Sequence, residues 1–123
     1  MSAEPDRFSS DSDDAYESAE AASSPTSPFG RWLAAVVSLG ASDLLLVQGA
    51  PPCMRIDGEV RKIEPGILDG SEIEAAVIPA LTSHAQRLYR EHLIADSSYR
   101  VQGLGRFRIN LHREQGRAAA AIR

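Results

Sequence analysis

Cysteine and long apolar runs are nearly absent from this 123-residue sequence, and each absence excludes a class of protein. Cys53 is the only cysteine, so the chain can form neither an internal disulfide nor a multi-cysteine metal site. No segment holds the roughly 18 consecutive apolar residues that a membrane-spanning helix needs. The first residues are acidic, whereas a secretory signal peptide begins with basic residues and an apolar run. These absences favour a cytoplasmic protein with no direct membrane insertion.

Basic residues are scarce in the first part of the chain. Residues 1–28 contain seven acidic residues and one arginine, together with eight serines and three prolines. Their net charge is −6, and because the whole chain carries −4, residues 29–123 carry +2. So polar a segment buries too little apolar surface to offset the entropy lost on ordering. We therefore expect a disordered acidic tail over residues 1–28 and a single folded domain over residues 29–123.

The folded part shows helices and strands without regular alternation. The spacing of apolar residues predicts a helix over 29–40, and the continuous apolar residues of 42–49 predict a strand buried on both faces. Residues 50–63 are expected to form two strands joined at Asp57-Gly58, a favoured hairpin turn. Three further strands are expected at the end of the sequence, over 96–101, 105–113 and 117–123.

Between these strands, residues 68–93 are expected to form two helices, separated by Pro79. Ser71 is the expected cap of the first, and Thr82 or Ser83 that of the second. The whole order predicts an α+β domain, with a mostly antiparallel sheet and its helices on one face. The expected core includes Trp32, Leu44, Leu46, Phe107, Ile109 and Leu111.

Arginines are concentrated in the last eighteen residues, which hold five of them. Alternation places Arg106 and Arg108 on the strand face opposite Phe107, and it places Arg117 and Arg123 together on one face of the returning strand. Arginine suits phosphate because its planar fork donates two parallel hydrogen bonds and stays charged. The same pattern also fits a solvated sheet face, since exposed strands normally carry charge.

Other site types find little support. The small net positive charge and the lack of aromatic residues on the arginine face do not favour nucleic-acid binding. The three histidines are too scattered to predict a metal site. The sequence has no G-x-x-x-x-G-K-[ST] phosphate loop, so the chain alone is expected not to hydrolyse nucleotide.

The blocks GASDLLLVQGAPPCMRIDGEVRKI (40–63) and GRFRINLHREQGRAAAAIR (105–123) resemble the N-terminal domain of the type IV pilus retraction, or twitching-motility, ATPases of the PilT and PilU type. These belong to the wider secretion-ATPase superfamily. The resemblance implies a PAS-like domain followed by a RecA-like ATPase domain. It implies cytoplasmic homo-hexamers that act with the inner-membrane platform of the pilus.

The resemblance also implies a set of site residues. Arg108 and Arg123, and less closely Arg117, are expected to contact the phosphates of ATP held with magnesium by the ATPase domain. Without the ATPase domain, the chain is expected to bind neither ATP nor magnesium tightly.

Two departures from the family pattern stand out. Leu45 occupies the position where the family usually has histidine, and the sequence ends where the family continues into its ATPase domain. We therefore expect a fragment of a longer protein. A stand-alone PAS-like interaction or sensory module, and the same domain of a pilus-assembly or type II secretion ATPase, remain open as alternatives.

Overall fold

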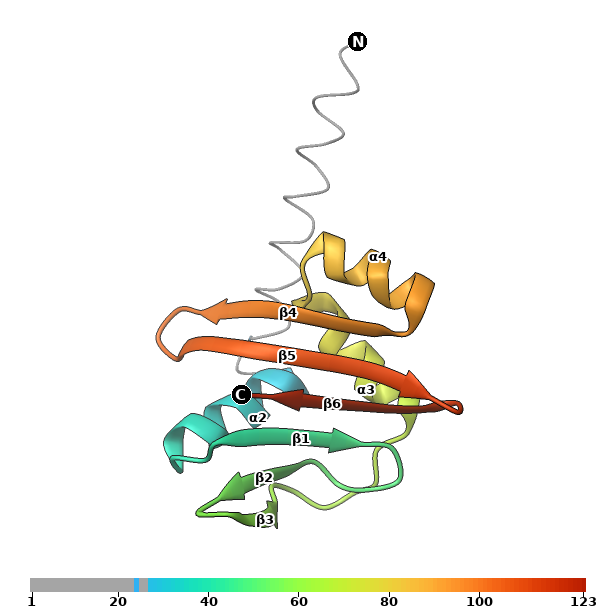
Figure 1. Cartoon of the computed structure of the whole chain (residues 1–123). Helices are drawn as coiled ribbons and strands as arrows, with labels where there is room; N and C mark the ends of the chain where they lie inside the picture. The colour runs from blue at the N-terminus through green and yellow to red at the C-terminus, as the bar shows by residue number, and fades with distance from the viewer. Residues whose placement is uncertain (1–23, 25–26) are drawn as a thin grey trace.

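The computed structural model describes Ser24 and residues 27–123, so the predicted acidic tail lies almost wholly outside the described residues. The described part contains helices and strands in irregular order, which confirms the predicted α+β class (Figure 1). In chain order the elements are α2 (Pro28–Ser38), β1 (Asp43–Val47), β2 (Cys53–Ile56), β3 (Glu59–Lys62), α3 (Gly70–Val77), the 3-10 helix η1 (Ile78–Ala80), α4 (Ser83–His92), β4 (Ile94–Val101), β5 (Gly105–Glu114) and β6 (Arg117–Ile122).

All the described strands form one sheet in the order β3-β2-β1-β6-β5-β4, and every neighbouring pair is antiparallel. The last strand, β6, therefore lies in the middle, between β1 and β5 (Figure 1). It joins the hairpins built from the early and late parts of the chain. This central position puts its side chains beside residues that lie up to about eighty positions away, such as the partner of Arg123, Asp43.

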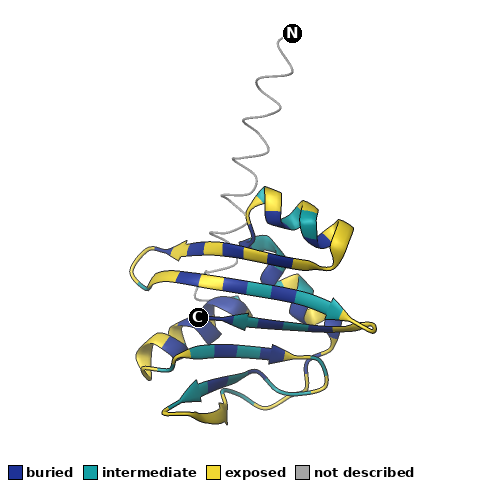
Figure 2. Cartoon of the chain, viewed as in Figure 1, coloured by how far each residue is buried: buried dark blue, intermediate teal, exposed yellow. Residues whose placement is uncertain are grey.

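The two faces of the sheet differ in what covers them. The helices α2, α3 and α4 contact β1, β6 and β4, respectively, and buried and exposed residues alternate along the strands (Figure 2). Every member of the predicted core is buried, Trp32 on α2 and the other five on the face of the sheet that the helices cover. We call the opposite face of the sheet, which no helix of the described part covers, the open face.

The prediction that β1 is buried on both faces is wrong. Leu44 and Leu46 are buried beneath the helices, but Leu45 is only partly buried and Val47 is 45% exposed on the open face. An apolar run tells only that a strand is apolar, and here the antiparallel sheet has helices on one side alone. The open face thus has an apolar centre, which also includes Ala119 and Ala121 opposite these two residues on β6.

The predicted turns and caps are mostly confirmed. Asp57 and Gly58 form the first hairpin turn with φ of 50° and 80°, the left-handed backbone that a two-residue turn needs. Thr82 caps α4 by accepting a hydrogen bond from the amide of Ala85. For α3, however, the cap is Asp69 and not Ser71, which lies within the helix.

Candidate anion-binding site

Four charged residues form a row across the open face, which we call the arginine row. They are Arg55 on β2, Asp43 on β1, Arg123 directly after β6, and Arg108 on β5. These residues lie side by side because their strands are neighbours in the order β2-β1-β6-β5. Asp43, for example, is paired with Arg55 in the β1–β2 register. Arg108 and Arg123 are direct neighbours too, because their backbones exchange two hydrogen bonds, of 2.8 and 2.9 Å.

Asp43 organises one side of this row. Its Oδ1 accepts a hydrogen bond from Nε of Arg123 at 3.1 Å, and its Oδ2 lies 3.4 Å from Nε of Arg55. Ser42 Oγ donates a further hydrogen bond to Oδ2 at 2.7 Å. The Asp43 side chain is only 13% exposed, so this carboxylate is held in place and in turn orients the two guanidinium groups. The terminal nitrogens of Arg123, whose side chain is 79% exposed, still point to solvent without a partner in the described part.

Arg108 has no such carboxylate. Its side chain is exposed and forms no ion pair or hydrogen bond with any residue that the structure describes. The row as a whole therefore carries three positive charges and one negative charge on adjacent rigid strands. Two neighbouring guanidiniums with open donors suit an oxyanion such as phosphate, which accepts several charge-assisted hydrogen bonds at once. The arrangement is suited to binding, and the row contains no nucleophile with a neighbouring general base that could carry out a reaction.

Arg117, the third predicted site residue, lies elsewhere. It precedes Arg123 by six residues on the extended strand β6, which corresponds to about 20 Å. Its Nη2 donates to the carbonyl oxygen of Gln48 at 3.1 Å, at the turn between β1 and β2. The structure thus brings Arg108 and Arg123 together and places Arg117 at the other end of β6.

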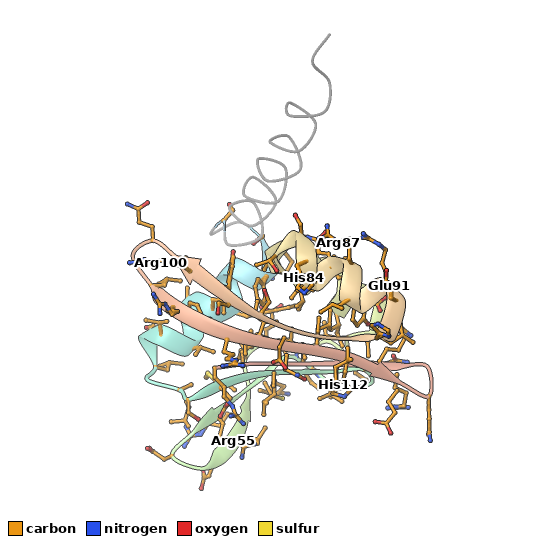
Figure 3. All side chains as sticks on the ribbon, turned by 45° about the horizontal axis from the view of Figure 1, so that its top comes forward. Arg55, His84, Arg87, Glu91, Arg100 and His112 are labelled. Carbon is orange, nitrogen blue, oxygen red and sulfur yellow. The ribbon has the colours of Figure 1, made fainter. Side chains whose placement is uncertain are left out.

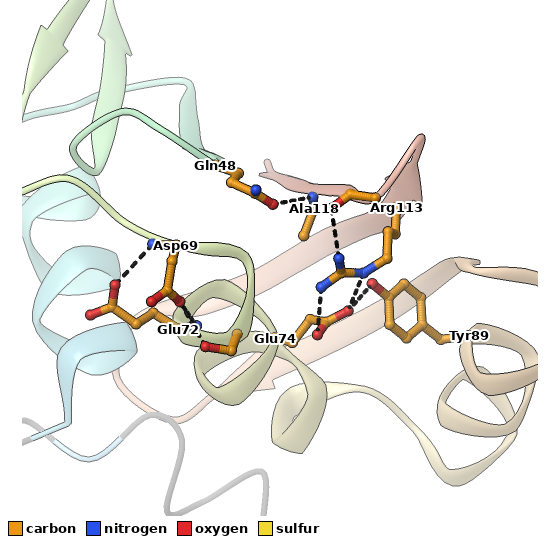
Figure 4. A network of polar contacts seen from close by, with 9 residues as sticks. Gln48, Asp69, Glu72, Glu74, Tyr89, Arg113 and Ala118 are labelled. Atoms are coloured by element: carbon orange, nitrogen blue, oxygen red, sulfur yellow. Dashed lines mark hydrogen bonds and ion pairs between the residues drawn. The ribbon is translucent and has the colours of Figure 1, made fainter.

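Arg113 lies on the helix side of the sheet and takes part in a network that sequence reasoning missed (Figure 4). Its Nε and Nη2 bind the two carboxylate oxygens of Glu74 on α3 at 3.0 and 2.9 Å, and Tyr89 on α4 donates its hydroxyl to the same carboxylate. Its Nη1 also donates to the carbonyl oxygen of Gly116 at 2.8 Å. One arginine therefore ties the β5–β6 turn to both helices.

This network shifts the ionisation of its members. The hydrogen bond from Arg113 lowers the pKa of Glu74, although partial burial acts in the opposite direction. Burial, followed by the hydrogen bond to Glu74, raises the pKa of Tyr89 to about 12. The signal that could have found the network is the alternation of β5, because Arg113 shares a face with Ile109 and Leu111 and needs a partner there.

The described residues offer no cluster of three or more histidine, cysteine, aspartate or glutamate side chains placed to hold a metal ion. No helix in this same part of the chain is long and apolar enough to cross a membrane.

Comparison with known proteins gives relatives of one kind. No protein-family model matches the chain. The chain is 37% identical over 83 residues to the type IV pilus retraction ATPase PilT of Pseudomonas aeruginosa, an alignment that covers 68% of this chain and 24% of that protein. It is 24% identical over 95 residues to the type IV pilus ATPase PilU of the same organism, covering 77% of this chain and 25% of the relative.

Solved structures agree with this. The crystal structure of the pilus retraction motor PilT with bound ADP matches with a TM-score of 0.67 and 32% identity, over 74% of this chain and 27% of that one. The ATPase DotB of Legionella pneumophila matches with a TM-score of 0.63 over 76% of this chain and 28% of that one, but at 22% identity it shows a shared fold alone. The chain spans about a quarter of the length of these relatives.

Proposed function

The chain belongs to the family of the type IV pilus ATPases PilT and PilU, as a counterpart of their N-terminal part. From this premise we propose that it is the nucleotide-contacting N-terminal domain of a pilus retraction ATPase. In this proposal the domain is PAS-like and works in a cytoplasmic homo-hexamer at the inner-membrane base of the pilus. Arg108 and Arg123 contact the phosphates of ATP held by a RecA-like ATPase domain. The retraction branch is preferred because the relatives at 37% and 32% identity are both named for retraction.

The single observation that carries the proposal is the Arg108–Arg123 pair on the open face. The two backbones are locked by their mutual hydrogen bonds, and Asp43 fixes the direction of Arg123. Binding of phosphate therefore requires little reordering of the Arg123 side chain, whereas the anion itself has to order the side chain of Arg108. The fit extends to the phosphates of ATP only; the phosphate loop and the magnesium ligands belong to the proposed ATPase domain.

The arrangement also suggests what the contact does. Bound ATP supplies the charge on its terminal phosphate, and the two arginines sit on β5 and directly after β6, near the middle of a single sheet. When hydrolysis removes that phosphate, the attraction between the ATPase domain and the open face decreases. The whole sheet, with its helices, then shifts as one body, which is how a local change of charge becomes a domain movement.

Arg117 does not share this phosphate. An anion bound between Arg108 and Arg123 lies about 20 Å from Arg117 along β6, too far for contact. The proposal therefore gives Arg117 a role toward ATP only if a second phosphate group binds near Gln48, at the other end of the strand.

Titration of the 123-residue chain with ATP, followed by the amide signals in NMR spectra, tests the phosphate contact. We expect weak binding, on the order of millimolar, because the remainder of the nucleotide site is supplied by the ATPase domain. The amides of Arg108 and Arg123 should shift, and Arg108→Gln should reduce the shift at Arg123.

Arg117→Gln is the matched control, since it removes the same charge from the same face of the sheet and should leave these shifts unchanged. Equal shifts at the exposed arginines of α4, Arg87 and Arg90, would show unspecific attraction and contradict the proposal. So would magnesium-dependent ATP hydrolysis by the pure chain.

A further inference from the structure

Two further arginines on the open face, Arg100 and Arg106, have no role in the proposed function. Arg100 on β4 and Arg106 on β5 are paired directly across the two strands, and both are exposed. Arg108 follows Arg106 on the same face, two positions along β5. We call these three residues the β4–β5 arginine cluster; Figure 3 labels Arg100 at the end of β4, away from Arg87 on α4.

The three arginines of the cluster carry positive charge that no acidic side chain of the described residues pairs with. Like charges directly opposite one another in an antiparallel sheet destabilise it. None of the three guanidinium groups has an ion pair or hydrogen bond with any residue of the described part. On the same face, Asp43 is engaged by Arg55 and Arg123. Asp96 lies about 13 Å from Arg100 along β4 but only about 7–8 Å from Arg108, its diagonal neighbour across the two strands. Arg100 and Arg106 have no acidic residue directly or diagonally opposite them on β4 and β5, so both are open to a negatively charged partner.

The chain itself contains a partner of matching charge. Residues 11–20 carry five carboxylates and no basic residue, namely Asp11, Asp13, Asp14, Glu17 and Glu20. The described residues 29–123 carry +2, so most of the molecule's excess negative charge resides in the segment before them. Charge complementarity therefore favours this segment as the occupant of the cluster.

The geometry of the first described residues supports the same partner. Ser27 caps α2, and the ring of Phe29 lies 6.0 Å from the ring of Tyr99, the residue directly before Arg100. Because β4 is an edge strand, a chain passing from the start of α2 to the open face has to go around one strand only. The seven residues from Glu20 to Ser27 can span up to about 25 Å, several times the strand spacing of about 4.8 Å.

We propose that the acidic segment 11–20 binds the β4–β5 arginine cluster of its own chain. The short connection gives the segment an effective concentration in the millimolar range at the cluster, so weak individual ion pairs suffice. This binding is independent of the proposed function. One consequence does rest on the proposed function: the segment and the ATP phosphates both bind Arg108 and therefore compete for it.

A spin label on the acidic segment measures the contact in the full chain. Cys53→Ser removes the only native thiol, and Ser12→Cys then accepts a nitroxide label. At low salt, the amide signals of Arg100, Arg106 and Arg108 should lose several-fold more intensity to the label than those of Arg87 and Arg90. In 1 M salt, where the screening length is about 3 Å, the difference should disappear.

Two matched charge variants decide whether the cluster is the binding surface. The double change Arg100→Gln and Arg106→Gln should abolish the selective broadening. The double change Arg87→Gln and Arg90→Gln removes the same charge from exposed positions of α4 and should preserve it. Removal of the like-charge pair should not destabilise the fold, so unfolding curves of the first variant serve as a check on its integrity.

Three outcomes would overturn the proposal. Equal broadening at the cluster and at α4 would show unspecific attraction, and no broadening would show that the segment does not bind. Broadening that increases with protein concentration would assign the contact to a second copy of the chain.

ATP provides the separate test of competition. If ATP restores the broadened signal of Arg108, the segment and the phosphates share this residue. If ATP shifts Arg123 but leaves the broadening intact, the proposed function stands and the competition fails. A further variant replaces all five carboxylates of the acidic segment by amides, so that no competition remains. If ATP shifts neither Arg108 nor Arg123 in this variant, while the native segment still broadens the cluster, the proposed function fails and the contact of the acidic segment stands.

Discussion

At the scale of single residues, Glu74 is the group whose protonation should control acid stability most clearly. The hydrogen bond from Arg113 lowers its pKa from the ordinary 4.5. A lowered pKa in the folded state means that the stabilisation is fully present above pH 4.5 and is lost as the pH falls through the lowered value. We expect Glu74→Gln to reduce the free energy of unfolding by about 1 kcal/mol at pH 7, since the pair is only partly buried.

Urea unfolding between pH 3 and pH 7 measures this effect. The difference in the free energy of unfolding between the native chain and Glu74→Gln should shrink toward zero at the acid end, because residue 74 is then uncharged in both proteins. Glu64→Gln is the matched control, since Glu64 pairs with Arg31 at 3.2 Å on the exposed surface and should have a much smaller effect. A constant difference at every pH would contradict the role of the Glu74 charge.

At the scale of elements, the residue that caps α3 differs from the one expected from the sequence. Asp69 accepts a hydrogen bond from the amide of Glu72 at 2.8 Å, and the Glu72 carboxylate in turn accepts one from the amide of Asp69 at 2.9 Å. Ser71, the cap expected from the sequence, instead donates its hydroxyl to Asp69. We expect Asp69→Ala to lower the melting temperature by a few degrees, because the first turn of α3 loses its acceptor.

Ser71→Ala should have a clearly smaller effect, and Asp69→Asn should retain most of the stability, since asparagine is also a good cap. Thermal unfolding followed by circular dichroism compares all three. If Ser71→Ala were the more damaging change, the assignment of the cap would be wrong.

The elements themselves could be predicted well from the sequence, because their signals are local. The helix of residues 29–40, the Asp57-Gly58 turn and the alternation of β5 all depend on residues within one segment. The Asp69 cap was accessible too, since Asp69 and Glu72 have the spacing of a capping box. The burial of β1 was not, because an apolar segment does not reveal how many sides of its sheet are covered.

The candidate site was only half predictable for the same reason. Alternation and the family resemblance identified Arg108 and Arg123 as members of one surface. That they are direct neighbours follows from the β5–β6 hairpin, in which Glu114 pairs with Arg117 at the turn and so sets the register; the same register leaves Arg117 at the opposite end of β6. The pairing of β6 with β1, which no local pattern encodes, brings Asp43 to Arg123 across eighty residues of sequence.

At the scale of the whole molecule, the two faces of the sheet differ in the kind of contacts that they make. Its helix side holds the apolar core and the Glu74–Arg113–Tyr89 network, whose ion pairs are satisfied within the domain. Its open face carries the arginine row and the β4–β5 arginine cluster, whose donors are only partly used by the described residues. The positive charge to which both proposals assign a partner therefore lies on the open face of the sheet.

Arg108 on this face is proposed to act on ATP held by another domain, and ATP hydrolysis by a chimeric ATPase is the decisive test. Residues 27–123 would replace the N-terminal part of the Pseudomonas aeruginosa PilT, and an active chimera would be the reference. Arg108→Gln should reduce ATP turnover by at least about tenfold, as expected for loss of a charged donor to the ATP phosphates, while Arg87→Gln should leave it unchanged. Equal turnover of the Arg108→Gln chimera and the reference would contradict the account.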